Sequence, residues 1–336
     1  MKGYYSMLKN QLVFNGELDV TYLLQKSYKK TENLVIIFSG MPADGKTPSY
    51  NYMGTLNYFD CNKLFILDDF GCRGSYYLCK NQDYSIERSV ISLINYIIKE
   101  NNIKTVLTCG SSKGGYAALY YGIKYGFDYI ISASPQFYLG DYLLKQSNSK
   151  DVATFISGDA KQNDHEYLNQ IMYNVINETS NRPNIFIHLG AGEPHYNDHV
   201  KPLLNSLKQN NLDYTLDLGD YCEHNDVGVH FPPILRKQIA EILGYPLIKS
   251  LSPLSGEYKK GETETFVVET DSNSNRIAWY LLHNKKIIHS QNYSNDNTFI
   301  ANFTEEGTYQ IKAFAINVKG MKVSMLSKPI IIENNM

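Results

Sequence analysis

The sequence has no large excess of charge, no long apolar run and no paired cysteine motif. Its 336 residues carry a net charge of −2, so no strong overall field favours binding to nucleic acid or anionic lipid. No stretch approaches the roughly 18 apolar residues of a membrane-spanning helix, and the first residues lack the apolar core of a signal peptide. These absences predict a cytoplasmic protein with no membrane span and no nucleic-acid partner.

Metal-binding motifs are also missing. The five cysteines are odd in number and form no C-x-x-C pair, so we expect reduced thiols. His195 and His199 stand four residues apart, but the H-E-x-x-H motif is absent and Pro194 makes His195 a poor helical residue. We therefore expect no metal and no tightly bound cofactor.

Short apolar runs alternate with helix-like segments from residue 34 onward. The runs are LVIIFSG, KLFILDD, TVLTCGS, YIISAS and IFIHLG, which suit strands buried on both faces. Between them, residues 87–101 and 196–211 place apolar side chains on one helical stripe. This alternation predicts the α/β class, with a doubly wound, mostly parallel sheet.

Two changes of pattern suggest the domain organisation. A polar stretch at about 140–182 interrupts the alternation and predicts a small lid, within a catalytic domain of residues 1–250. From residue 251 to 336 the apolar period changes to two, which is typical of a β-sandwich. Trp279 on an inner strand and Tyr309 at a corner position favour an immunoglobulin-like fold for this accessory domain.

A candidate nucleophile lies in the segment TVLTCGSSKGGYAALYYG, which contains G-x-S-x-G between a predicted strand and a predicted helix. A serine on such a turn needs small neighbours, because its backbone is strained and the helix passes close to the strand. Gly110, Gly114 and Gly115 meet that need. The G-x-x-x-x-G-K-[ST] order of a phosphate-binding loop is absent. The pattern therefore predicts an α/β-hydrolase-type fold with Ser112 as the nucleophile.

A serine nucleophile needs a histidine to take its proton and a carboxylate to orient that histidine, in the chain order Ser, acid, His. His224 and His230 both lie in the segment where the base is expected. His224 has polar neighbours typical of an exposed loop, whereas His230 adjoins Phe231 and Pro232, where packing can explain it. We favour His224 as the base and keep His230 as the alternative.

The acid is expected a few residues after the strand that contains His188, which we interpret as a core histidine. Glu193 and Asp198 both satisfy this position. Asp198 can also serve as a helix cap, and Glu193 lies nearer to the strand end. We favour Glu193 and keep Asp198 as the alternative acid.

Two backbone amides are candidates for an oxyanion hole. The amide of Lys113 follows the nucleophile at a helix N-terminus. The second donor in this fold comes from the loop after an early strand, here FSGMPADGK. The amide of Met41, which follows Gly40, is our prediction for that donor.

These segments together resemble a family of bacterial α/β-hydrolase-fold enzymes that act on surface carbohydrates. The family comprises capsular polysaccharide biosynthesis proteins and O-acetyltransferases, including the glycan O-acetyltransferase of the accessory secretion system. The resemblance covers roughly residues 30–245 and is carried by Asp68-Asp69-Phe70-Gly71, Arg73-Gly74-Ser75-Tyr76-Tyr77, Gly110-Ser111-Ser112-Lys113-Gly114-Gly115, Glu193-Pro194-His195-Tyr196 with His199, and His224-Asn225-Asp226.

The resemblance implies a triad of Ser112, an acidic residue and His224, and transfer of an acetyl group to a sugar hydroxyl. The resemblance also implies acetyl-CoA as the donor. No phosphate-binding motif marks a CoA site, so this donor rests on the resemblance alone. Our leading hypothesis is therefore a carbohydrate O-acetyltransferase. A carbohydrate esterase with the same triad is the first alternative, and a non-catalytic glycan-binding or assembly protein is the second.

Overall fold

The computed structural model describes residues 10–158, 162–253 and 256–333. The chain forms two compact units, one of Met1–Met53 with Cys61–Pro232 and one of Gly54–Asp60 with Pro233–Met336. All five cysteines are free. Within the described ranges, no helix is long and apolar enough to cross a membrane.

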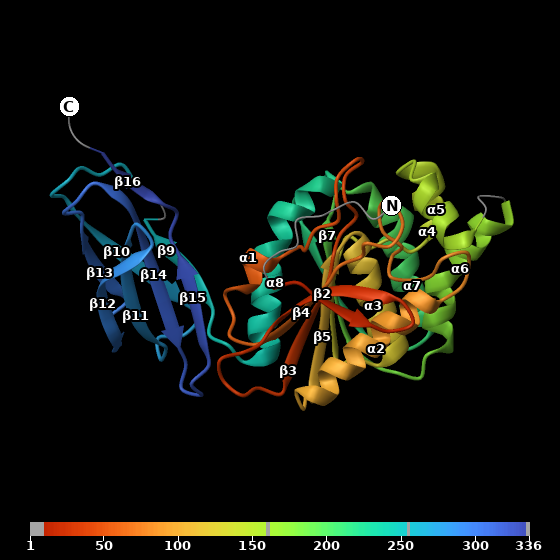
Figure 1. Cartoon of the computed structure of the whole chain (residues 1–336), viewed down its shortest axis with the longest axis horizontal. Helices are drawn as coiled ribbons and strands as arrows, with labels where there is room; N and C mark the ends of the chain where they lie inside the picture. Colours follow the sequence, from red (N-terminus) through yellow and green to blue (C-terminus); the bar gives the residue numbers. More distant parts are fainter. Residues whose placement is uncertain (1–9, 159–161, 254–255, 334–336) are drawn as a thin grey trace. The chain divides into compact units, whose positions relative to one another are not determined.

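The first unit is built around an eight-stranded sheet with the order β1-β2-β4-β3-β5-β6-β7-β8 (Figure 1). Its strands are β1 (Leu12–Asn15), β2 (Asp19–Gln25), β3 (Asn33–Phe38), β4 (Asn62–Ile66), β5 (Thr105–Ser111), β6 (Tyr129–Ala133), β7 (Asn184–Gly190) and β8 (Tyr214–Gly219). The six strands β4, β3, β5, β6, β7 and β8 are parallel to one another. The mostly parallel α/β sheet predicted from the alternation is therefore confirmed.

Helices connect these strands, and one further helix, α8, follows the last of them. The longer ones are α2 (Ser85–Glu100), α3 (Lys113–Tyr125), α6 (Gln162–Glu178), α7 (Lys201–Gln209) and α8 (Val227–Leu243), and α1 (Met53–Leu56) is a single turn. Helices α2, α3, α6 and α7 lie on one side of the sheet in Figure 1. On α2, the apolar stripe of Val90, Leu93, Ile94 and Ile97 is buried, as the helical spacing predicts.

The stretch predicted as a lid is helical. It contains α4 (Leu139–Asp141), a π-helix (Tyr142–Gln146), α5 (Lys150–Ser157) and α6. Helix α6 buries Leu168, Met172 and Ile176 in the core of the first unit. Helix α6 is therefore the crossover helix between β6 and β7, packed on the sheet by its apolar face. Residues 139–157 form the more irregular part of the stretch.

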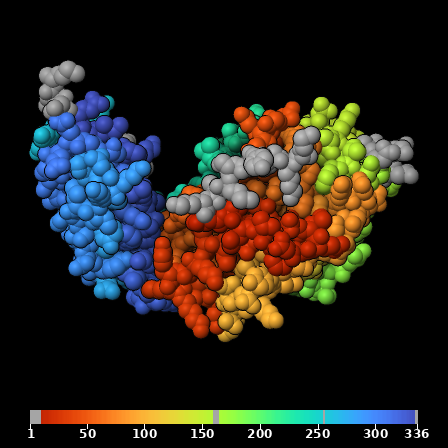
Figure 2. Space-filling model, viewed as in Figure 1, coloured from red at the N-terminus to blue at the C-terminus, as the bar shows by residue number. Residues whose placement is uncertain are grey.

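The sequence analysis did not identify β1 and β2. They form an antiparallel hairpin, and β2 pairs antiparallel with β4 at the sheet edge. The outer strand leaves Leu12 47% and Val13 42% exposed, and the hairpin, in red, lies on the surface in Figure 2. Because β1 buries so little apolar surface, its sequence carries only a weak strand pattern.

The second unit contains two antiparallel sheets. One has the order β13-β10-β9 and the other β12-β11-β14-β15, with β16 paired to β14. The strands are β9 (Ile248–Ser252), β10 (Thr263–Thr270), β11 (Arg276–His283), β12 (Lys286–Ser294), β13 (Thr298–Asn302), β14 (Gly307–Ile316), β15 (Lys322–Leu326) and β16 (Ile330–Ile332). Trp279 of β11 is fully buried and stacks on Phe299 of β13, with 5.5 Å between ring centroids. The two sheets therefore share a core.

A segment from the early part of the chain belongs to this second unit. Phe59 forms an isolated β-bridge with Val323 and packs edge-on against the ring of Tyr245. The hydroxyl of Tyr245 donates to the carbonyl of Asp60 at 2.6 Å. Residues 54–60 and 233–250, which the proposed boundary at residue 250 places in the catalytic domain, thus lie in the second compact unit.

Candidate active site

The turn that holds Ser112 is strained and closely packed. Ser112 joins β5 to α3 with φ 52° and ψ −122°, a left-handed conformation that costs free energy in any residue other than glycine. Its amide donates to the carbonyl of Ala133 on β6, and its carbonyl accepts the first helical bond, from the amide of Tyr116. The backbone thus fixes Ser112 on both sides, as expected for a nucleophile at a strand-to-helix turn.

Glycines make this turn sterically feasible. A Cβ on Gly110 would lie 2.4 Å from the carbonyl oxygen of Gly114, and one on Gly114 would lie 2.3 Å from that of Phe38. Any side chain at either position would therefore displace backbone. The packing of Gly114 on Phe38 also brings the end of β3, and the loop that follows it, beside the start of α3.

The structure brings Ser112, His224 and Glu193 into one hydrogen-bonded chain. The Oγ atom of Ser112 lies 3.0 Å from Nε2 of His224, and Nδ1 of His224 lies 2.9 Å from Oε2 of Glu193. The three residues follow β5, β8 and β7, which belong to the same parallel run of strands, with carboxyl ends at one edge of the sheet. Their order along the chain and their contacts are those of a nucleophile, acid and base.

Glu193 is held as a carboxylate. Its side chain is buried, which by itself raises its pKa, but hydrogen bonds from His224, the amide of Gly190 and the hydroxyl of Ser134 outweigh burial and lower the pKa below its ordinary value. The Ser134 and Gly190 donors reach Oε1 at 2.7 and 3.0 Å. The remaining oxygen, Oε2, is directed at His224, which orients the imidazole ring.

The alternative acid and base lie elsewhere. Asp198 is exposed on the π-helix Tyr196–Val200, and its carboxylate accepts from the amide of Gln146. His230 is exposed on α8 and stacks on the ring of Tyr221, with 4.4 Å between centroids. His188 is a fully buried core histidine whose two nitrogens contact Asp217 and Tyr221.

Lys113 is directed away from solvent. Its ammonium pairs with Oδ2 of Asp68 at 2.6 Å, and both side chains are fully buried. Asp68 also accepts hydrogen bonds from the amides of Ser75 and Tyr77. Burial lowers the pKa of Lys113, and Asp68 opposes that shift. The side chain of Lys113 is therefore committed to the core, which leaves only its backbone amide for a role in the site.

The loop predicted to supply the second oxyanion donor lies beside the nucleophile turn. A Cβ on Gly40 would be 3.9 Å from the carbonyl oxygen of Ser111, and the amide of Gly40 donates to Asn51 at 2.7 Å. Met41 follows directly and is partly buried against the core. The loop that carries Met41 therefore lies beside the nucleophile turn, and the role of the Met41 amide stays a prediction.

The sequence analysis missed Ser134 and Gln136, and it considered His195 only as a metal ligand and as part of a family motif. Ser134 bonds to Glu193, as described above. Gln136 is fully buried, and its Nε2 lies 3.2 Å from Oγ of Ser112. His195 stacks on His224 with 4.1 Å between ring centroids and 12° between planes. Ser134 and Gln136 follow β6 without any recognised motif, so only the three-dimensional adjacency of β5, β6 and β7 identifies them.

Residues at the site could also contact a metal ion. One donor atom each from Glu193, His195 and His224 lies within 4.8 Å of the others, and imidazole and carboxylate are ligands that Zn²⁺ accepts. A metal bound through Oε2 of Glu193 and Nδ1 of His224 would have to replace the hydrogen bond between them. The arrangement described here instead uses that bond to hold the imidazole against Ser112.

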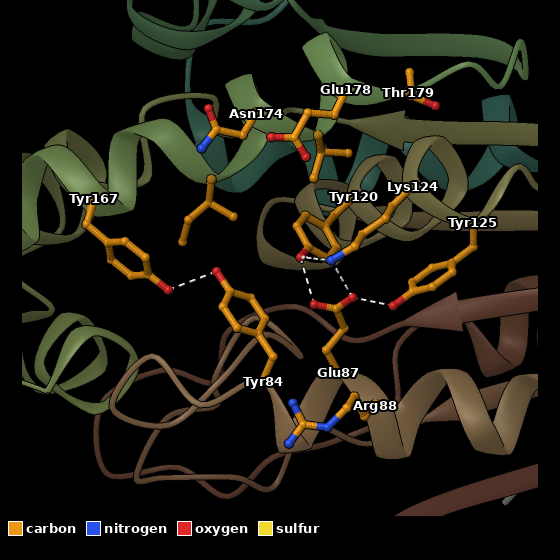
Figure 3. Close-up of a pocket in the computed structure, with 12 residues that line it drawn as sticks. Tyr84, Glu87, Arg88, Tyr120, Lys124, Tyr125, Tyr167, Asn174, Glu178 and Thr179 are labelled. Atoms are coloured by element: carbon orange, nitrogen blue, oxygen red, sulfur yellow. Dashed lines mark hydrogen bonds and ion pairs between the residues drawn. The ribbon is translucent and has the colours of Figure 1, made fainter.

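A separate cavity of about 540 Å³ lies at the opposite end of α3 from Ser112 (Figure 3). On one wall the hydroxyls of Tyr84 and Tyr167 meet at 2.8 Å. On its floor, the buried carboxylate of Glu87 accepts from the hydroxyl of Tyr120 and pairs with Lys124. These polar groups satisfy one another, and the cavity is distinct from the cluster around Ser112.

No protein-family model and no curated protein matches the sequence. Several solved structures share the fold, although each is under 25% identical. The capsule O-acetyltransferase of Neisseria meningitidis serogroup A matches with a TM-score of 0.60 and 24% identity, over 71% of this chain and 97% of that chain. The Glycosylation Associate Protein complex from Streptococcus agalactiae matches with a TM-score of 0.58 and 18% identity, over 70% of this chain and 48% of that chain.

A hydrolase shares the same architecture. The S-formylglutathione hydrolase of Staphylococcus aureus matches with a TM-score of 0.50 and 13% identity, over 69% of this chain and 97% of that chain. The first unit of this protein therefore has an α/β-hydrolase-like fold, similar to that of a bacterial capsule O-acetyltransferase and of a glycosylation-associated protein.

Proposed function

We propose that this protein is a serine-dependent acyltransferase that moves an acetyl group to a hydroxyl of a bacterial surface or capsular carbohydrate. The observation that carries the proposal is the unbroken hydrogen-bonded chain from Ser112 through His224 to Glu193. This chain joins a nucleophile, a base and an orienting carboxylate on a strained turn.

In the first step, Oγ of Ser112 attacks the carbonyl carbon of the acetyl donor, and its proton passes to Nε2 of His224. The carbonyl π electrons move onto the oxygen, where the amides of Lys113 and Met41 stabilise the negative charge. When the carbonyl re-forms, the bond to the leaving group breaks, and the leaving group takes the proton from His224. An acetyl-serine remains.

In the second step, a sugar hydroxyl attacks the acetyl-serine and gives its proton to His224. The bond between the acetyl carbon and Oγ then breaks, its electron pair stays on Oγ, and His224 returns the proton to Ser112. The carboxylate of Glu193 stabilises the imidazolium that forms in both steps. This cycle regenerates the enzyme without a metal or a bound cofactor.

Acetyl-CoA and a glycan are the proposed donor and acceptor. They are supported by the sequence motifs and by the similar fold of the Neisseria meningitidis capsule O-acetyltransferase, one structure of which is a complex with CoA (TM-score 0.59). The cytoplasmic location that we propose from the sequence fits this donor. A carbohydrate esterase is the second candidate, because water can take the place of the sugar hydroxyl at the same three residues.

For the second unit we propose an immunoglobulin-like sandwich that positions or recognises the glycan. The hydroxyl of Tyr309 bonds to both the amide and the carbonyl of Glu305, four residues upstream, as a corner tyrosine does. The buried Trp279 between the two sheets also supports this assignment.

The deciding experiment follows acetyl release and acetyl transfer with acetyl-CoA or p-nitrophenyl acetate, with and without bacterial capsular polysaccharide. Release of CoA that depends on polysaccharide, with acetyl groups recovered on the polymer, is expected of the transferase. Rapid hydrolysis that no glycan diverts would identify an esterase. Absence of both activities would leave the non-catalytic glycan-binding or assembly role.

A further inference from the structure

Gln136 lies against the reacting oxygen of the proposed nucleophile. It follows β6 by three residues, and its side chain is completely buried. Its Nε2 atom is 3.2 Å from Oγ of Ser112 and 3.3 Å from Nε2 of His195. One amide nitrogen thus bridges the nucleophile and a second histidine.

The surroundings determine which way the amide of Gln136 faces. With nitrogen toward Ser112 and His195, both N–H groups have partners, and only Oε1 is buried without one. If the amide were reversed, the NH₂ group would take the present place of Oε1, where neither of its N–H groups would have a hydrogen-bond partner. Burying two unsatisfied donors costs more than burying one unsatisfied acceptor. The orientation that presents the N–H groups to Ser112 is therefore favoured.

His195 is suited to accept one of these N–H groups. Burial, with further contributions from His224 and then His199, lowers the pKa of His195 to about 3, so the ring is neutral near pH 7. A neutral imidazole has one acceptor nitrogen. Because Nε2 faces the N–H donor of Gln136, the proton of His195 lies on Nδ1. Stacking on His224 and contact with the edge of Tyr142 hold the ring in place.

We propose that Gln136 is a further catalytic residue, whose amide donates to Oγ of Ser112, and that His195 is the positioning residue that fixes this amide. The inference rests on the proposed function, since it concerns the reactivity of Ser112.

The amide determines where the Ser112 proton points. Gln136 presents a donor to Oγ, and the hydroxyl of Tyr142, which also bonds to Ser112, can itself donate. Nε2 of His224 is an acceptor because Nδ1 keeps the ring proton toward Glu193, so the hydroxyl hydrogen of Ser112 is directed to Nε2. That is the direction in which the proton must leave during attack. The hydrogen bond of Gln136 to Oγ then remains in place while the bond from Oγ to the acetyl carbon forms.

The same donor acts when the acetyl-serine is consumed. The bond between Oγ and the acetyl carbon breaks, and its electron pair stays on Oγ until His224 returns the proton. An N–H group already aimed at Oγ stabilises that charge without reorganisation, in a buried setting where such donors have large effects. Gln136 therefore assists both departure of Oγ in the second step and proton transfer in the first.

Substitution of Gln136 by Met tests the inference, because Met is similar in length but has no donor. We expect the rate of Ser112 labelling by a fluorophosphonate, and kcat for p-nitrophenyl acetate, to fall roughly 10- to 100-fold, with KM and the melting temperature little changed. Gln136→Leu is the second variant if the first does not fold. Gln310→Met is the matched control, since Gln310 bonds a backbone carbonyl in the second unit, and it should keep the wild-type rate.

His195→Phe tests the positioning role, because Phe keeps an aromatic ring but lacks the acceptor nitrogen. We expect a smaller loss of kcat than for Gln136→Met, again with KM unchanged. If His195 acts through Gln136, the double variant should be no slower than Gln136→Met alone. Losses that multiply in the double variant would overturn the role assigned to His195.

The two proposals fail in different ways. If the folded wild-type protein is not labelled at Ser112 by the fluorophosphonate, the proposed function itself fails. If the wild type is labelled, but folded Gln136→Met and Gln136→Leu are labelled at the wild-type rate, the catalytic role of Gln136 is overturned. A fall in melting temperature with an unchanged kcat would likewise make Gln136 a purely structural residue.

Discussion

Glu193→Gln tests the candidate site most sharply, because the substitution replaces one carboxylate oxygen by an NH₂ group and keeps the shape. The Oε1 atom of Gln can still accept from Ser134 and from the amide of Gly190, so the side chain should keep its position. The new NH₂ group then stands where Oε2 lies 2.9 Å from Nδ1 of His224. Since an NH₂ group only donates, Nδ1 must become the acceptor nitrogen of the imidazole.

This change of tautomer removes the base. The ring proton moves to Nε2, which faces Oγ of Ser112 at 3.0 Å and can no longer accept the serine proton. An equivalent change of tautomer in a serine protease lowers kcat about 10⁴-fold, and four decades correspond to roughly 5.4 kcal/mol of activation free energy. We expect a loss of this order in kcat for p-nitrophenyl acetate, with KM nearly unchanged.

The matched control is Asp198→Asn, at the alternative acid. Asp198 is exposed and bonds only to the amide of Gln146 among the contacts described above, so its variant should keep the wild-type rate. Steady-state kinetics at neutral pH, together with melting temperatures, separate a lost base from a lost fold. A folded Glu193→Gln variant within tenfold of wild type would refute the reasoning, and a dead Asp198→Asn variant would reassign the acid.

Four further outcomes are expected. Ser112→Ala should abolish fluorophosphonate labelling detected by gel fluorescence, whereas Ser111→Ala should keep it. His224→Ala should lose kcat by orders of magnitude while His230→Ala stays active, and the reverse result would make His230 the base. Lys113→Met leaves a carboxylate buried without its cation and should destabilise the fold by about 3 kcal/mol in urea unfolding, whereas an unchanged midpoint would show the pair to be dispensable. Dialysis against EDTA should leave the aryl-acetate rate unchanged, and a loss restored by Zn²⁺ would indicate a metal site.

The sequence was sufficient to predict those features that depend on a short segment alone. The central strands are buried on both faces, so β3, β5 and β7 appear in the sequence as continuous apolar runs. The turn at Ser112 needs tiny neighbours at fixed spacing. Glu193 and His224 were located because strand ends and chain order restrict where an acid and a base can lie, and the structure brings both to Ser112.

Features that depend on long-range packing were not predictable in this way. Gln136 and His195 are 59 residues apart in the chain, and nothing in either local sequence indicates that they share a contact. The pairing of Lys113 with Asp68 across the core was equally unpredictable. From the sequence alone, a lysine beside a nucleophile suggests an anion-binding role, not burial. Residues 54–60 pack with the C-terminal strands through Phe59, a partnership without any local signal.

Ser112 and Ser134, whose hydroxyls both belong to the site, have the same kind of backbone strain. Ser112 has φ 52° and Ser134 has φ 43°, and they occupy corresponding places at the carboxyl ends of the neighbouring strands β5 and β6. Such conformations cost of order 1–3 kcal/mol each, so they persist only where surrounding contacts impose them. The amide of Ser112 is bonded to the carbonyl of Ala133, and that of Ser134 to the carbonyl of His188. Each strained serine is thus anchored to the next strand, which holds one hydroxyl against His224 and the other against Glu193.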